Sequence, residues 1–506
     1  MENKIKLPKL QKISEASLKR PKILLLGDDL TAFSGIATMS RTFVFGTVDR
    51  FNWVQLAAAV KHPNDGKVID YSAEARKITG VDDAIVKLYP STGYGDPNKL
   101  RRLLDTEKPD AIIHFTDPRF WGWLYEMEDE IHFQYKIPII YYAIWDNFPY
   151  PLWNHSAYAS CDCILGISKQ SHLIHTKVLE CGGTDVVDLE NGDLLSDYKP
   201  GSVITKYVPH GIDSNMFRPL KSGDRDWDEF VKFKKDLFKG FKKAPRFVVF
   251  WNNRNIKRKR PGDLIYAFKL FIDQLPAKHR NETLLLLHTD PVDRHGTDLI
   301  ATQNTLAPDC NIMFHTDRLA PEKMNFLYNV ANVTINIASN EGFGLSSAES
   351  IMSGTPIINN VTGGLQDQMR FVDDDGNWFQ PNNEISSNHL GHYTKCGSWA
   401  FPIFPDLRTL QGSVPTPYIF DDIADPLTIS NAIYDAWKTD RATLRKVGQE
   451  GREWLLGEAN MSAKAMSDGI AKGIQDTINV WQPRPRIHIE RVKGQPVVKE
   501  TGVTAY

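Results

Sequence analysis

The sequence predicts an α/β protein of two domains, each built on a mainly parallel sheet. Short apolar runs of strand length, such as residues 22–27, 247–251 and 333–337, alternate with segments of helical periodicity. The chain of 506 residues is long enough for more than one hydrophobic core. Hydrophobic residues make up 42% of it and charged residues 24%, which is ordinary for a globular protein. A fibrous or disordered chain is therefore excluded.

The first domain is expected over residues 21–215, after a charged leader at residues 1–20. Its first strand, residues 22–27, leads through a loop with Gly35 into a helix. Further strands are predicted at residues 108–114 and 137–144, and the domain ends at a His-Gly turn. Backbone amides near a glycine can approach a ligand closely, so Gly35 is a candidate binding residue.

The second domain is expected over residues 246–460, after a basic connector at residues 216–245. Residues 375–420 are rich in Asn, Ser, Pro and Gly and lack periodicity, which indicates an insertion. Residues 462–481 show a helical pattern, and we assign residues 461–506 to a final helix and an extended tail.

The most informative stretch of the chain begins at Glu341. A predicted strand precedes it, a short helix carries Glu349, and another strand follows at residues 355–358. The loop between the carboxylates is Gly342-Phe343-Gly344-Leu345. Open α/β sheets bind ligands at such junctions, where amides and a helix N-terminus attract phosphate. Each carboxylate can bind a pair of sugar hydroxyls, so the stretch predicts a nucleotide-sugar site.

This stretch resembles the donor site of GT-B glycosyltransferases, in particular retaining family 4 with its Glu-x7-Glu motif. The resemblance implies two Rossmann-like domains facing a central cleft, with the last helix crossing back to the first domain. It also implies that Glu341 holds the transferred sugar and Glu349 the ribose. The donor-binding residues would then be Gly35, Gly342, Phe343, Gly344, Leu345 and Glu349.

Two basic residues of the second domain match the same family. It has an Arg after the first strand of this domain and a Lys five residues later, which correspond to Arg254 and Lys259. Fixed cations stabilise the leaving diphosphate best where water is excluded. The resemblance implies retaining transfer of a hexosyl or pentosyl group without an enzyme nucleophile. The nucleotide-sugar is then a substrate, and no cofactor or metal is required.

The first domain departs from the family pattern where many members have a histidine near the reacting sugar. Here Trp145 and Asp146 follow the strand. Trp145 can stack on a sugar or an acceptor ring, and Asp146 can orient or deprotonate an acceptor hydroxyl. A core Trp145 with a turn-capping Asp146 is the alternative. His114 and Trp121 are further candidate acceptor residues, with structural roles as the alternative.

The acceptor is predicted from an uneven charge distribution. Residues 232–260 hold twelve basic residues and one acidic residue, and aromatic residues are frequent in the first domain. This combination is typical of nucleic-acid binding. It suggests a DNA-modifying transferase of bacteriophage type, acting on a hydroxymethylated base flipped from the helix. The alternatives are a glycan, lipid or small-molecule acceptor, or a non-catalytic nucleotide-sugar-binding protein.

The remaining composition suggests a cytoplasmic protein. Five cysteines are few and unpaired in pattern, so zinc and disulfide frameworks are not expected. The Lys-rich N-terminus lacks the apolar segment of a signal peptide, and no apolar run reaches membrane-spanning length. The predicted partner is therefore a nucleotide-sugar, with nucleic acid as a candidate acceptor through residues 232–260.

Overall fold

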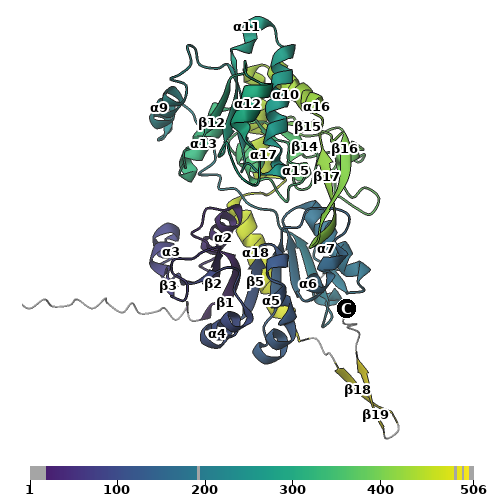
Figure 1. Cartoon of the computed structure of the whole chain (residues 1–506). Helices are drawn as coiled ribbons and strands as arrows, with labels where there is room; N and C mark the ends of the chain where they lie inside the picture. The colour runs from purple at the N-terminus through teal and green to yellow at the C-terminus, as the bar shows by residue number, and fades with distance from the viewer. Residues whose placement is uncertain (1–16, 18, 191–193, 484–486, 493–494, 501–506) are drawn as a thin grey trace, which may run out of the picture.

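The structure, a computed structural model, describes residues 17, 19–190, 194–483, 487–492 and 495–500. Two α/β domains lie one above the other, joined by chain segments on one side (Figure 1). The predicted α/β class is confirmed. The charged leader lies outside the described residues except for positions 17, 19 and 20.

The first domain is built on a nine-stranded sheet in the order β3-β4-β2-β1-β5-β6-β7-β9-β8. Only the short edge strand β3 is antiparallel to its neighbour among the pairs described. Strand β5 is buried along its whole length, as expected for a strand covered on both faces. The strands are β1 (Lys22–Asp28), β2 (Asn52–Ala59), β3 (Ile69–Asp70), β4 (Val86–Thr92), β5 (Ala111–Phe115), β6 (Ile139–Ala143), β7 (Cys163–Gly166), β8 (Val186–Asp188) and β9 (Val203–Tyr207).

Helices cover both faces of this sheet, and several begin at side-chain caps. Ser34 accepts a hydrogen bond from the N–H of Ala37, and Ser168 accepts one from Ser171. These caps fix where α2 and α7 start, at the end of the sheet that faces the second domain (Figure 1). The helices are α2 (Gly35–Phe45), α3 (Ser72–Thr79), α4 (Pro97–Glu107), α5 (Gly122–Glu126), α6 (His155–Ala159), α7 (Lys169–Cys181) and α8 (Leu194–Asp197).

The second domain is built on a parallel six-stranded sheet in the order β12-β11-β10-β13-β14-β15. Its strands are β10 (Phe247–Asn252), β11 (Thr283–His288), β12 (Ile312–His315), β13 (Val333–Asn336), β14 (Ile357–Asn360) and β15 (Ala400–Ile403). Its helices are α9 (Trp227–Leu237), α10 (Pro261–Gln274), α11 (Ala277–Arg280), α12 (Leu299–Leu306), α13 (Pro321–Val330), α14 (Leu345–Met352), α15 (Leu365–Met369), α16 (Pro426–Lys438) and α17 (Arg441–Leu456).

Two regions for which the sequence predicted no regular element contain helices or strands. The connector includes α9, whose Phe230 and Phe233 pack against Phe326 of α13. Residues 375–420 include β15, the sixth strand of the sheet, and most of a hairpin of β16 (Leu407–Ser413) and β17 (Thr416–Ile423). Strand β15 has only four residues and contains a proline, so it shows no readable alternation.

The last helix returns to the first domain, as predicted. Helix α18 (Ala463–Val480) packs beside α2 and β7, and Ser462 forms a bridge with Ile212 before it begins (Figure 1). Gly46 lies so close to Ser467 that an added Cβ would overlap the serine side chain. The tail beyond α18 contains β18 (Ile487–Val492) and β19 (Gln495–Glu500), and its other residues from 484 onward lie outside the described part.

Candidate active site

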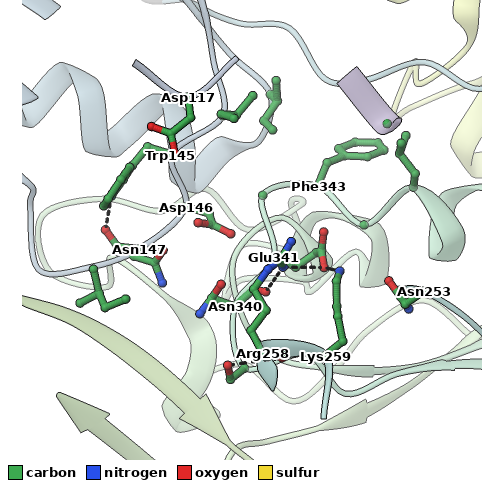
Figure 2. A pocket seen from close by; sticks show the side chains of 18 of the residues that line it. Asp117, Trp145, Asp146, Asn147, Asn253, Arg258, Lys259, Asn340, Glu341 and Phe343 are labelled. Carbon is green, nitrogen blue, oxygen red and sulfur yellow. Dashed lines mark hydrogen bonds and ion pairs between the residues drawn. The ribbon is translucent and has the colours of Figure 1, made fainter. Parts of the chain in front are cut away.

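A cleft of about 960 Å³ lies between the two domains, at the carboxyl ends of both sheets. It is lined by three groups of residues: loops of the first domain, loops of the second domain, and the β16–β17 hairpin. Figure 2 shows these side chains converging, with Glu341 between the two halves of the site. Ligands of open α/β sheets bind at this kind of position.

The glycine loop before α14 brings the two domains into close approach. Gly344, the residue before α14, has a φ of 90°, which favours glycine. A Cβ on Gly342 would lie 3.2 Å from the carbonyl oxygen of Ile144 in the first domain. A Cβ on Gly35 would lie 3.3 Å from the side chain of Leu345. The structure therefore places the predicted donor-binding glycines together in the cleft.

Glu341 lies at the centre of a cluster of opposite charges. The ammonium group of Lys259 contacts its Oε2 directly, and Nη1 of Arg258 lies 3.3 Å from the same oxygen. Arg258 also donates to the carbonyl oxygen of Asn340 at 2.9 Å. The side chains of Lys259 and Glu341 are only 8% and 12% exposed. Buried charges need partners of opposite sign, and here Lys259 and Glu341 are the partners of each other.

The protonation of Lys259 depends on this cluster. Burial lowers the pKa of Lys259 well below its usual value, and the charge of Arg258 lowers it further, while Asp146 raises it. A carboxylate in contact favours the charged ammonium. Glu341 therefore helps to keep Lys259 protonated in a site where a phosphate can take over as its partner.

Arg254 occupies a different place from the one that the family resemblance implies. It does not line the cleft, is 65% exposed, and forms an ion pair with Asp293 at 2.9 Å. Arg258, four residues later, reaches Glu341 instead. Sequence analysis did not single out Arg258, because adjacent basic residues cannot be told apart by charge alone.

Glu349 lies on α14 and faces a buried hydroxyl. Tyr328 donates to its Oε2 at 2.6 Å and accepts a hydrogen bond from Asn252 at 2.9 Å. Burial raises the pKa of Glu349 to about 7, although the hydrogen bond from Tyr328 lowers it. At neutral pH this carboxyl is therefore poised between its two protonation states.

The first domain contributes Trp145, Asp146 and Asn147 to the opposite wall (Figure 2). Trp145 is 8% exposed and donates from Nε1 to the carbonyl oxygen of Asn147 at 3.0 Å. Burial raises the pKa of Asp146, while Arg258 and Lys259 lower it. Both candidates thus line the cleft, and Trp145 also belongs to the hydrophobic core.

His114 and Trp121 lie in the core of the first domain and do not line the cleft. The His114 ring forms a hydrogen bond with Tyr125 at 2.7 Å, and burial lowers its pKa to about 3. His210 lines the cleft instead, 5.1 Å from the ring of Phe343, and burial lowers its pKa to about 3 as well. A neutral histidine of this kind orients neighbours rather than carrying charge.

The lysines of residues 232–243 lie on and after α9, and none of them lines the cleft. Helix α9 sits at the outer edge of the second domain, beside β12 and α13 (Figure 1). The basic region 232–260 therefore divides into two parts. Residues 257–260 belong to the cleft and the earlier lysines to a separate surface.

Solved structures resemble the fold of the chain over 90–91% of its length. HepE of Anabaena, in complex with UDP and glucose, has 13% identity and a TM-score of 0.57, over 90% of this chain and 100% of that chain. Sucrose-phosphate synthase of Thermosynechococcus elongatus has 15% identity and a TM-score of 0.57, over 91% and 100%. The α,α-trehalose 6-phosphate synthase of Burkholderia multivorans has 12% identity and a TM-score of 0.59, over 91% and 99%.

These comparisons establish the GT-B fold of the chain, as predicted. At such low identities the likeness shows the fold alone. No protein-family model and no curated protein matches the sequence. Within the described residues, no helix is long and apolar enough to span a membrane, and no group of three or more His, Cys, Asp or Glu side chains could hold a metal ion.

Proposed function

We propose that the protein is a glycosyltransferase that moves a sugar from a nucleoside-diphosphate sugar to an acceptor hydroxyl. The observation that carries this proposal is the cluster of Glu341, Lys259 and Arg258 beside the glycine loop of α14. It combines a carboxylate for sugar hydroxyls with two cations for a diphosphate, at the position where α/β sheets bind nucleotides.

The donor would lie along the second domain. Its diphosphate would meet the N-terminal end of α14 together with Lys259 and Arg258, and Glu349 would bind the ribose. We propose that these groups neutralise the diphosphate without a metal ion. HepE has been solved with UDP-glucose, which makes UDP-sugars the first donors to test.

The proposed reaction retains the anomeric configuration, as in family 4 of these enzymes. The acceptor oxygen attacks the anomeric carbon from the face that the diphosphate leaves, the glycosidic C–O bond breaks, and a leaving phosphate oxygen takes the acceptor proton. Lys259 and Arg258 stabilise the charge that grows on the diphosphate. Asp146, on the facing wall, would orient the acceptor hydroxyl.

A hydroxymethylated base in DNA remains the acceptor that the sequence predicts, and the lysines of residues 232–243 are the surface that favours it. These lysines lie away from the cleft, so a bound duplex would have to extend from the cleft to α9. The alternative is an acceptor that binds in the cleft alone. The polar side chains of Asp146 and Asn147 in the cleft wall favour this alternative.

A panel of nucleotide-sugars tested by thermal shift, followed by calorimetry, examines the donor proposal. We expect one nucleoside diphosphate and its sugar to bind, and binding to persist in EDTA. NMR of the transfer product should show retained configuration at the anomeric carbon. Binding of no nucleotide-sugar would refute the glycosyltransferase proposal, whereas an inverted product would refute only the retaining mechanism.

A further inference from the structure

The β16–β17 hairpin reaches from the second domain across the cleft to the first domain (Figure 1). The N–H of Phe420 donates to the carbonyl oxygen of Phe148 at 2.7 Å, and Asn147 donates to the carbonyl oxygen of Phe420 at 3.2 Å. The ring of Tyr418 lies 4.4 Å from that of Trp153. The hairpin thus forms a wall of the cleft that contacts both domains.

The base of this hairpin is fixed by the buried Asp422. Arg408 donates to both of its carboxylate oxygens, at 2.6 and 2.9 Å, and Thr362 donates to one of them at 2.8 Å. The N–H of Asp422 donates to the carbonyl oxygen of Ser339 at 2.9 Å. Strand β17 is therefore held in a single register.

Because side chains alternate along a strand, the neighbours of Asp422 point the other way. Ile419, Asp421 and Ile423 all line the cleft, as this alternation requires. The Asp421 carboxylate accepts a hydrogen bond from Asn340 at 2.7 Å, directly beside Glu341 in the sequence. Asp421 is thus a positioned carboxylate at the meeting point of the sugar-binding loop and the facing wall.

The half of the cleft formed by the hairpin and the first domain carries little positive charge. Among its described lining residues, Arg119 alone has a permanent positive charge, and its guanidinium is paired with Asp117 at 2.5 Å. Besides Asp117, the carboxylates of Asp146 and Asp421 lie in the same half. Burial raises the pKa of Asp146 most, the charges of Arg258 and Lys259 lower it, and the charge of Asp421 raises it. The cations at 257–260 belong to the donor side.

Resting on the proposed glycosyl transfer, we propose that this wall selects an uncharged acceptor rich in hydroxyls, with Asp421 as the specificity-determining residue. Carboxylate groups accept hydrogen bonds from hydroxyls, and amide groups both accept and donate them. An acceptor with a phosphate near its reacting hydroxyl would meet the carboxylates of Asp146 and Asp421, because the donor diphosphate would occupy the cations of residues 257–260. Specificity of this kind uses repulsion as well as attraction.

Paired acceptors test this proposal in the presence of the bound nucleoside diphosphate. The probes are glucose and glucose 6-phosphate, glycerol and glycerol 3-phosphate, inositol and inositol 1-phosphate, and a hydroxymethylated oligonucleotide. Saturation-transfer NMR measures binding in this complex, and release of the nucleoside diphosphate from the nucleotide-sugar measures turnover in a separate assay. We expect a neutral probe to bind and its phosphorylated partner to bind at least about tenfold more weakly.

The Asp421→Asn variant should reduce this ratio to below about threefold, because the amide keeps the shape and loses the charge. Its affinity for the nucleotide should not change. Asp374→Asn, which removes an exposed carboxylate outside the cleft, is the matched control and should keep the wild-type ratio.

Equal or tighter binding of the phosphorylated or nucleic-acid probes by the wild type would overturn the proposal. An unchanged ratio in Asp421→Asn, or no neutral probe bound, would also overturn it. Failure of the underlying glycosyltransferase proposal would show separately, as a loss of nucleotide binding by the wild type.

Discussion

Replacing Glu341 with Gln should lower both the stability of the protein and its transfer activity, because it removes the negative charge that pairs with Lys259 and Arg258. Lys259 and Glu341 are each about nine-tenths buried. Removing one partner of a buried pair costs about 3–5 kcal/mol. Lys259 can lose its proton, since burial already lowers its pKa, and this relief favours the lower end of the range. We expect the free energy of unfolding to fall by about 3 kcal/mol in denaturant titrations.

The same change should reduce transfer without preventing nucleotide binding. Losing a charged hydrogen bond to a sugar hydroxyl costs about 1.5–3 kcal/mol, which lowers kcat/KM by about tenfold to about 150-fold. The nucleoside diphosphate should still bind, because its phosphates replace Glu341 as the partner that keeps Lys259 protonated, whereas the contact with the sugar is lost. Calorimetry with the nucleoside diphosphate and nucleotide release with the sugar donor separate the two effects.

A double-mutant cycle tests whether the ion pair is the cause. In the Glu341→Gln background, Lys259→Met should cost less stability than it does in the wild type, because the lysine has already lost its partner. A coupling free energy of at least about 1 kcal/mol is expected for residues in contact. Additive losses would refute the reasoning from the pair, and a fully active Glu341→Gln variant would refute the sugar-binding assignment.

Four further predictions concern the cleft and the lysines of residues 232–243. Nucleotide affinity should rise roughly tenfold from pH 6 to pH 8 as Glu349 ionises around pH 7 to bind the ribose, and calorimetry should find no such rise in Glu349→Gln. Stability should move the other way, because a raised pKa favours the folded state at low pH and this contribution is lost as the pH rises through about 7. Arg258→Ala should lower kcat at least about tenfold while Arg254→Ala changes it less than about threefold, and equal losses would restore Arg254 to the donor site. Changing the lysines of residues 232–243 to Ser should leave nucleotide affinity unchanged. If DNA is the acceptor, gel-shift titrations should show that log K for DNA depends less steeply on log salt concentration, by up to about 0.9 per lost phosphate contact.

The sequence was sufficient to predict the elements whose signals are local. The apolar runs of β10 and β13 and the glycine loop before α14 each depend on neighbouring residues, and the structure has them where the patterns indicate. The GT-B fold was predicted because these local signals occur in the family's order. The return of α18 to the first domain was predicted from the family resemblance, because no local sequence pattern specifies which distant segment a helix packs against.

The site could be predicted only in part, because its geometry depends on long-range contacts. Arg254 and Arg258 are equivalent as charges, and only the path of the short helix at residues 257–259 decides which one reaches Glu341. Asp421 was missed because its importance arises from a hairpin that crosses the cleft. Its alternation with the buried Asp422 was the one available signal, and it is readable only once β17 is known to be a strand.

The return of α18 also constrains how the chain is made. The first domain buries Met466, Ile470 and Ile474 of this helix, although its own last strand ends at Tyr207. About 250 residues separate Ile212 from Ala463, which a ribosome translating roughly 5–20 residues per second needs roughly 12–50 s to synthesise. During that interval the first domain lacks its closing helix and exposes apolar surface. Completion of the first domain therefore waits until α18 has left the ribosome.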